Sequence, residues 1–195
     1  MLNILLLKAS PNKNGNTNTL LNKSLSGLKK CLNEKDEKFN IKSILPRQLD
    51  IQPCQGCGFC EKQYRCKIKN DDMQDIIKYL IKTDIIIIAT PVYFNGIPAQ
   101  LKKIIDRCQV LWAKKYKENS KNFIKHKKGL FLATGGAPEY KDQFRGIKAV
   151  IRIFFKTINT DLIDKLFIAN TDQNPVIKRK DILEKAYQLG ERLGK

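Results

Sequence analysis

The feature that most constrains the fold is an alternation between short, continuously apolar runs and longer segments with helical apolar spacing. The runs at residues 4–7 and 85–89 contain no polar residue. A strand buried on both faces reads this way, whereas a strand with one solvent face alternates between apolar and polar residues. Such strands, alternating with helices, form parallel sheets with crossover helices on both faces. The sequence therefore predicts an α/β fold, a doubly wound parallel sheet in three α/β/α layers.

Five strand–helix units are expected along the chain. The expected strands are 2–7, 39–44, 85–89, 129–133 and 162–169, and the expected helices are 18–31, 73–81, 99–111, 144–158 and 182–193. A length of 195 residues suits one core. We therefore expect a single domain over residues 1–195, with a cysteine-rich loop at about 45–70. A loop this long inside a compact domain normally has a function or is tied down.

Composition narrows the classes of protein that fit. The longest apolar run falls far short of the ~20 residues that a membrane helix needs, and the start reads as a strand rather than a leader. We therefore expect a cytoplasmic protein without membrane insertion. The net charge of +18 would attract acidic partners. The lysines are spread along the chain and no arginine-rich arm occurs, which favours a solvated surface and makes a nucleic-acid-binding module a remote alternative.

In an open parallel sheet, ligands bind beyond the carboxyl ends of the strands. The loop after the first strand offers hydroxyl, amide and amino groups beside the free amides of a helix start, which suits a phosphate monoester. A well-capped helix start uses the same residue types, so that alternative stays open. The phosphate-binding candidates are Ser10, Asn12, Lys13, Asn16 and Thr17.

The loops after the third and fourth strands suit a flat heteroaromatic ring. The first has prolines and a glycine that shape the backbone around an aromatic pair, and the second has two glycines that let backbone approach a ring. The alternative is a hydrophobic turn that merely covers the core. The ring-binding candidates are Pro91, Val92, Tyr93, Phe94, Asn95 and Gly96 in the first loop, and Thr134, Gly135 and Gly136 in the second.

Three segments together resemble the NADPH-dependent FMN reductase group of the flavodoxin-like superfamily. They are Ser10-Pro11-x-x-x-Gly15-Asn16-Thr17, Thr90-Pro91-Val92-Tyr93-Phe94 and Leu101-Lys102-x-x-Ile105-Asp106-Arg107. The resemblance implies a five-stranded flavodoxin-like sheet of order 2-1-3-4-5, and FMN whose phosphate lies at Ser10 and residues 16–17 and whose ring lies against residues 91–96 and 134–136. It also implies NAD(P)H as a co-substrate and a homo-oligomer, a dimer or tetramer. The family commonly has glycine and arginine where this chain has Ala9 and Asn12, although Lys13 can supply the missing charge.

Four of the six cysteines lie in one short loop with the spacing Cys54-x2-Cys57-x2-Cys60-x5-Cys66. Compact spacing lets one loop present several thiolates to one inorganic core, as the bacterial ferredoxin run does with a shorter last gap. The spacing also resembles the iron-sulfur flavoprotein branch of the superfamily, which implies a [4Fe-4S] cluster. The alternatives are a structural zinc and unligated thiols. Zinc sites usually pair their ligands across a longer spacer, so the cluster is favoured.

Six further residues receive structural interpretations. Cys31 and Cys108 fall on expected helices and are predicted to be core residues. The acidic pair at 71–72 is expected to cap the following helix. Asp106 and Arg107 are expected to pair locally or to support a subunit contact.

The sequence thus predicts an FMN-dependent oxidoreductase that transfers electrons between NAD(P)H or a small redox carrier and an acceptor, through FMN and a [4Fe-4S] cluster. A flavin performs the difficult chemistry itself, so no side-chain acid, base or nucleophile is required. The principal alternative is an NAD(P)H-dependent FMN or quinone reductase whose cysteine loop holds no metal.

Overall fold

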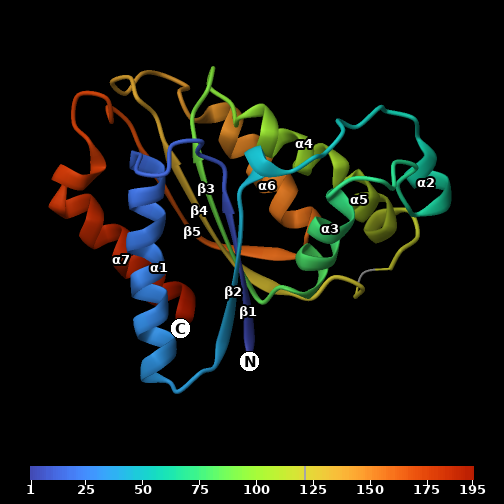
Figure 1. Cartoon of the computed structure of the whole chain (residues 1–195), viewed down its shortest axis with the longest axis horizontal. Coiled ribbons are helices and arrows are strands. Elements are labelled where there is room, and N and C mark those ends of the chain that lie inside the picture. Colours follow the sequence, from blue (N-terminus) through green and yellow to red (C-terminus); the bar gives the residue numbers. More distant parts are fainter. Residues whose placement is uncertain (121) are drawn as a thin grey trace.

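The computed structural model describes residues 1–120 and 122–195. Its centre is a parallel sheet of five strands in the order β2-β1-β3-β4-β5 (Figure 1). The strands are β1 (Leu2–Lys8), β2 (Phe39–Ile44), β3 (Ile85–Pro91), β4 (Lys127–Thr134) and β5 (Thr160–Ile168). The predicted doubly wound flavodoxin-like sheet of order 2-1-3-4-5 is confirmed.

Helices cover both faces of the sheet, so the three-layer arrangement is also confirmed. The helices are α1 (Asn16–Glu34), α2 (Phe59–Gln63), α3 (Met73–Lys82), α4 (Ala99–Arg107), α5 (Gln109–Tyr116), α6 (Arg145–Thr157) and α7 (Lys180–Gly194), with short 3-10 turns η1 (Pro46–Gln48) and η2 (Val176–Lys178). Figure 1 shows α1 and α7 on one face and α3 to α6 on the other. Each face has its own cluster of buried apolar side chains.

The central strands are the ones with continuous apolar runs. Every residue of β3 except its last is buried, whereas the edge strand β5 has exposed positions between buried ones and the edge strand β2 has only its last residue buried. The physical reason is that helices from both layers cover the central strands, while each edge strand has one side without a neighbouring strand. The apolar runs therefore mark the middle of the sheet.

The expected helix at 99–111 is wrong in one respect, because the structure divides it at Cys108. This residue ends α4 and begins α5 with a backbone ψ of 3°, a turn rather than a helical conformation. Leu101 and Leu111, from the two helices, pack into the same core cluster, so apolar spacing continues across the break. Cys31 and Cys108 are both buried, which confirms them as core residues.

Helices α1 and α7 lie with their backbones unusually close. A Cβ atom at Gly27 would overlap the backbone carbonyl of Tyr187, and one at Gly190 would overlap the backbone carbonyl of Ser24. Each helix thus has a glycine where the other helix approaches.

Across residues 1–120 and 122–195, none of the helices combines the length and the hydropathy that crossing a bilayer requires. Because all five strands are parallel, their carboxyl ends share one edge of the sheet, at the top of Figure 1. The loops that contain the candidate cofactor residues follow β1, β3 and β4 at this edge.

Candidate cofactor site and cysteine loop

Thr134, the last residue of β4, joins the three candidate loops. Its hydroxyl lies 2.6 Å from the hydroxyl of Thr17 in a buried hydrogen bond. Its backbone carbonyl accepts a hydrogen bond of 2.9 Å from the amide of Val92, which follows β3. The structure therefore brings the loop after β1, the loop after β3 and the loop after β4 to one place.

The first loop leaves the start of α1 open. The Ser10 hydroxyl accepts a hydrogen bond of 3.3 Å from the amide of Asn12, and the Asn12 side chain accepts one of 3.1 Å from the amide of Asn14. Gly15 occupies the N-cap position, and no side chain caps the helix. The expected alternative, a helix start satisfied by its own side chains, is therefore not what the structure shows. An uncapped helix start directs free N–H groups and a positive dipole end outward.

Two candidates in this loop use their side chains for contacts within the protein. Asn16 donates to the carbonyl of Thr171 at 3.2 Å and accepts from the amide of Val176 at 2.8 Å. Thr17 is buried against Thr134. What these two residues present to a ligand is therefore their backbone amides, while the exposed Lys13 keeps its side chain free to approach an anion.

The loop after β3 forms a tight hairpin. Tyr93 and Gly96 exchange two backbone hydrogen bonds of 3.0 and 2.8 Å, and the two residues between them have φ angles of 47° and 57°. These are the angles of a two-residue turn. Phe94 at the turn is fully exposed, so it does not cover the core, contrary to the hydrophobic-turn alternative. Asn95 accepts a hydrogen bond from the hydroxyl of Tyr140.

The loop after β4 packs on the loop after β5. The amide of Thr171 donates to the carbonyl of Gly135 at 3.1 Å, and the amide of Asp172 donates to the carbonyl of Gly136 at 3.1 Å. A Cβ atom at Gly136 would collide with the Asp172 carboxylate. The loop after β5 is not among the predicted site residues, although its position at the carboxyl end of a strand is a signal that could have identified it.

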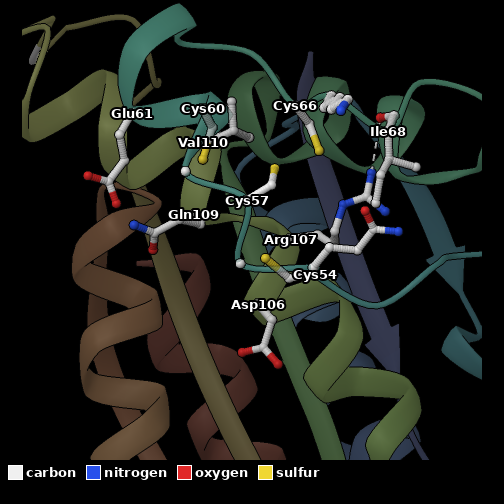
Figure 2. Close-up of a pocket in the computed structure, with 14 residues that line it drawn as sticks. Cys54, Cys57, Cys60, Glu61, Cys66, Ile68, Asp106, Arg107, Gln109 and Val110 are labelled. Carbon is white, nitrogen blue, oxygen red and sulfur yellow. Dashed lines mark hydrogen bonds between the residues drawn. The ribbon is translucent and has the colours of Figure 1, made fainter.

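The four cysteines of the 45–70 loop line a single cavity of about 470 Å3. Figure 2 shows the four sulfur atoms around this cavity, whose opposite wall comes from the junction of α4 and α5. Cys54 and Cys57 are exposed, Cys60 and Cys66 are half-buried, and all four are free thiols. Burial raises the pKa of the Cys60 thiol.

Two glycines shape this loop. Gly56 and Gly58 have φ angles of 64° and 66°, in the left-handed region that favours glycine. A Cβ atom at either position would meet nothing within 4 Å. The backbone turn, and not close packing, is therefore the reason for glycine at these positions.

Zinc and an iron-sulfur cluster place different demands on the thiols of this loop. Among the described residues, no group of three or more His, Cys, Asp or Glu side chains is placed to hold a metal ion. Zinc requires its ligands to converge at about 2.3 Å from one point. Each cysteine of a [4Fe-4S] cluster binds a different iron, so its ligands are spread around a larger core. Four thiols around one cavity are the ligand type that such a cluster requires.

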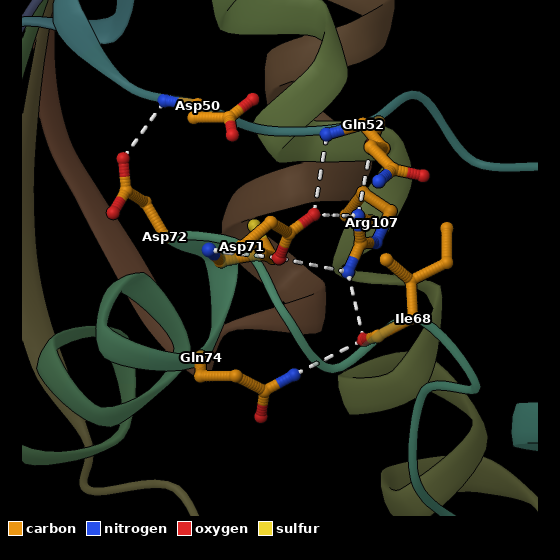
Figure 3. A network of polar contacts seen from close by, with 8 residues as sticks. Asp50, Gln52, Ile68, Asp71, Asp72, Gln74 and Arg107 are labelled. Carbon is orange, nitrogen blue, oxygen red and sulfur yellow. Dashed lines mark hydrogen bonds and ion pairs between the residues drawn. The ribbon is translucent and has the colours of Figure 1, made fainter.

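A buried ion pair holds the two ends of the cysteine loop together (Figure 3). Arg107 donates to the Asp71 carboxylate at 2.5 Å, and both side chains are almost fully buried, at 1% and 0% exposed. Arg107 also donates to the carbonyl of Gln52 at 2.8 Å, before the cysteines, and to that of Ile68 at 3.3 Å, after them. Burial alone would raise the pKa of Asp71, but the hydrogen bonds from Arg107 and from the Gln52 amide hold it below its ordinary value.

This network corrects two predictions. Asp71 accepts a hydrogen bond of 3.1 Å from the Met73 amide, but Asp72 makes no capping hydrogen bond, and its carboxylate accepts from the amide of Asp50 instead. The expected local pair of residues 106 and 107 is wrong. Asp106 pairs with Lys102, one turn earlier on α4, whereas the guanidinium of residue 107 turns inward to Asp71.

Comparison with known proteins supports the fold and identifies the family. The family model for NADPH-dependent FMN reductases matches residues 2–146. An iron-sulfur flavoprotein from Archaeoglobus fulgidus is 40% identical over 98 residues, which are 50% of this chain and 47% of that protein. An iron-sulfur flavoprotein from Methanosarcina thermophila is 33% identical over 132 residues, 67% of this chain and 62% of that protein. The matches thus span about half to three-fifths of these relatives.

A solved structure has the same fold over the full length of both chains. It is an FMN-dependent NADH-azoreductase from Bacillus anthracis in complex with FMN, with a TM-score of 0.74 and 13% sequence identity. At this identity the likeness concerns the fold alone. The family match runs from β1 to the first two residues of α6, and it includes the first loop, the cysteine loop, the hairpin after β3 and the whole loop after β4. This chain therefore belongs to the NADPH-dependent FMN reductase family.

Proposed function

We propose that this chain is an FMN-dependent oxidoreductase, one domain over residues 1–195, that accepts electrons from NAD(P)H or from a small redox carrier. The observation that carries the proposal is the meeting of three loops at Thr134 beside an uncapped helix start. A phosphate needs free N–H donors and positive charge, and a planar ring needs an open shelf of backbone beside it. The carboxyl edge of this sheet offers both.

Each loop has a part in holding FMN. The α1 amides of residues 16 and 17, with the Ser10 hydroxyl, bind the phosphate, and Lys13 neutralises part of its charge. The hairpin at 91–96 and the backbone at 134–136 lie along the ring. When bound, FMN supplies hydride acceptance and one-electron transfer, so the protein's contribution is binding, orientation and electrostatics.

The cysteine cavity is proposed to hold a [4Fe-4S] cluster through Cys54, Cys57, Cys60 and Cys66. Three observations support this: the four free thiols, their spread around one cavity, and the name of the matched relatives. The cluster would pass on single electrons. The alternative is an FMN or quinone reductase of the same family whose thiols bind no metal.

Further properties are proposed from the family resemblance and the composition. The protein works in the cytoplasm as a dimer or tetramer, with a nicotinamide nucleotide or small carrier as its partner. The spread of lysines over the surface favours solvation over nucleic-acid recognition.

Comparing FMN with riboflavin tests the phosphate assignment directly, because riboflavin has the same ring and no phosphate. We expect the flavin-free protein to bind FMN at least roughly 10 to 100 times more tightly, because even one charge-assisted hydrogen bond contributes about 1.5–3 kcal/mol. Lys13→Gln should weaken the binding of FMN and leave the affinity for riboflavin unchanged. Equal affinities for the two flavins would contradict the proposal.

Purification without oxygen tests the cluster. We expect iron, acid-labile sulfide and a broad brown absorbance in addition to the flavin spectrum. Cys57→Ala should abolish the brown absorbance and retain FMN, whereas Cys31→Ala, a cysteine outside the loop, should retain both. Protein with FMN and without iron or sulfide would favour the reductase that has no cluster.

A further inference from the structure

Arg107 contains an unsatisfied buried donor. Among the described residues its Nε–H group has no hydrogen-bond partner, although the side chain is only 1% exposed. The two terminal nitrogens of the same guanidinium are occupied by Asp71 and by the carbonyls of Gln52 and Ile68. An unpaired buried donor costs about 1–3 kcal/mol, and native structures rarely keep one. Such a donor therefore indicates an acceptor that completes the site.

The position of the guanidinium shows what kind of acceptor is available. Arg107 lines the cavity that the four cysteines line. Figure 2 shows the Cys66 sulfur close to the guanidinium, at the side of the cavity where the cysteine loop meets α4. Burial lowers the pKa of Arg107, but the hydrogen bond that it donates to Asp71 and the proximity of Cys66 raise it overall. The Cys66 sulfur is thus an acceptor that lies beside the guanidinium in this cavity.

We infer that Arg107 is a positioning residue for the cysteine ligands, whose Nε–H donates to the sulfur of Cys66 in the cluster-loaded protein. The inference deepens the proposed function and rests on it. Arg107 thus has two roles. It binds the loop backbone on both sides of the cysteines, and it places a positively charged hydrogen-bond donor beside one ligand sulfur. Hydrogen bonds to ligand sulfur and positive charge nearby stabilise the reduced, more negative form of a cluster. Arg107 therefore raises the cluster's reduction potential.

Arg107→Lys tests this in protein purified without oxygen. Lysine retains the charge but lacks both the fork that spans Asp71 and the Nε–H. We expect a lower cluster potential in a redox titration followed by electron paramagnetic resonance, and less than half of the wild-type iron content after dilution into chelator. The potential of bound FMN should stay unchanged.

Gln74→Ala is the matched control. Gln74 donates to the carbonyl of Ile68 at 3.2 Å, so its removal loosens the same loop end without touching the guanidinium. A residue that acted only by fastening the loop would change iron retention alone. We therefore expect Gln74→Ala to retain the wild-type potential. A potential unchanged in Arg107→Lys, or shifted equally in both variants, would overturn the inference.

A measurement on the unaltered protein covers the case in which Arg107→Lys does not fold. With 15N-labelled arginine, we expect one Nε–H resonance that exchanges slowly and shifts when the cluster is reduced. Arg65→Lys, which removes an arginine that lies between Cys60 and Cys66, should leave that resonance in place. No such resonance in a protein that contains iron and sulfide would refute the role of Arg107 alone. Absence of iron and sulfide would instead refute the proposed cluster, and the inference with it.

Discussion

Replacing Asp71 by asparagine removes the charge that balances Arg107 while preserving the shape of the side chain. The Asp71 carboxylate accepts hydrogen bonds from the guanidinium at 2.5 and 3.3 Å and from the amides of Gln52 and Met73 at 3.1 Å each. Asparagine has one acceptor oxygen in place of two, so some of these donors lose their partner. The guanidinium would remain buried without a counter-charge.

The expected cost follows from this burial. Removing one partner of a buried ion pair typically costs about 3–5 kcal/mol, because the other charge stays out of water. Domains have a total free energy of unfolding of about 5–15 kcal/mol, so the loss is a large fraction of it. Asp75→Asn is a matched control four residues away, since Asp75 pairs with Lys78 and both side chains are about two-thirds exposed, at 66% and 70%. Water screens that pair, and its loss should leave stability unchanged within error.

The dependence on pH gives the reasoning a second test. The pKa of the Asp71 carboxyl is lower in the folded protein than in the unfolded chain, where it is about 3.9. The carboxylate therefore makes its full contribution to stability at a pH above the pKa of the unfolded chain, and this contribution is lost as the pH falls through the pKa of the folded protein. The difference in unfolding free energy between wild type and Asp71→Asn should therefore be largest near neutral pH and shrink below about pH 4.

Urea unfolding followed by far-ultraviolet circular dichroism measures these differences, with the same ionic strength and FMN concentration for all three proteins because bound ligand shifts apparent stability. The reasoning fails if Asp71→Asn costs no more than Asp75→Asn. It also fails if the difference from wild type stays constant into acid.

Two further predictions concern the scaffold of the cofactor site. Gly27→Ala should lower the free energy of unfolding by about 1–3 kcal/mol although alanine favours a helix, because its methyl group would overlap the Tyr187 carbonyl and push α1 away from α7. Urea unfolding measures this, with Ser26→Ala at an exposed position as the control. A Gly27→Ala variant more stable than wild type would show that the two helices have space for the methyl group. Thr17→Val should weaken FMN binding, because the buried hydroxyl of Thr134 loses its hydrogen-bond partner and the two loops separate. Flavin fluorescence measures the dissociation constant, and an unchanged constant would mean that this hydrogen bond does not organise the site.

Most of the sheet could be predicted from residues alone, because continuous apolar runs are a local consequence of burial on both faces. The runs in β1 and β3 identified the centre of the sheet, and turn residues identified the loops at its edge. The strand order came from resemblance to a family. No local pattern reports which strands are neighbours.

The contacts that organise the site depend on residues far apart in the sequence, and these could not be predicted. Asp71 and Arg107 are 36 positions apart, and each has a more obvious local explanation, a helix cap or an adjacent pair. The side chain of Asn16 has the right chemistry for a phosphate, but only the fold shows that it turns toward Thr171. Composition identifies donors, whereas packing decides where each one points.

The hydrogen bonds of Asn16 also have a consequence for biosynthesis. Its two partners, Thr171 and Val176, lie 155 and 160 positions further along the chain. At about 5–20 residues per second, a ribosome needs on the order of ten to thirty seconds to add that stretch. Until then the first loop of a nascent chain lacks the partners that hold it, so flavin capture should follow late in synthesis, however early the first strand emerges.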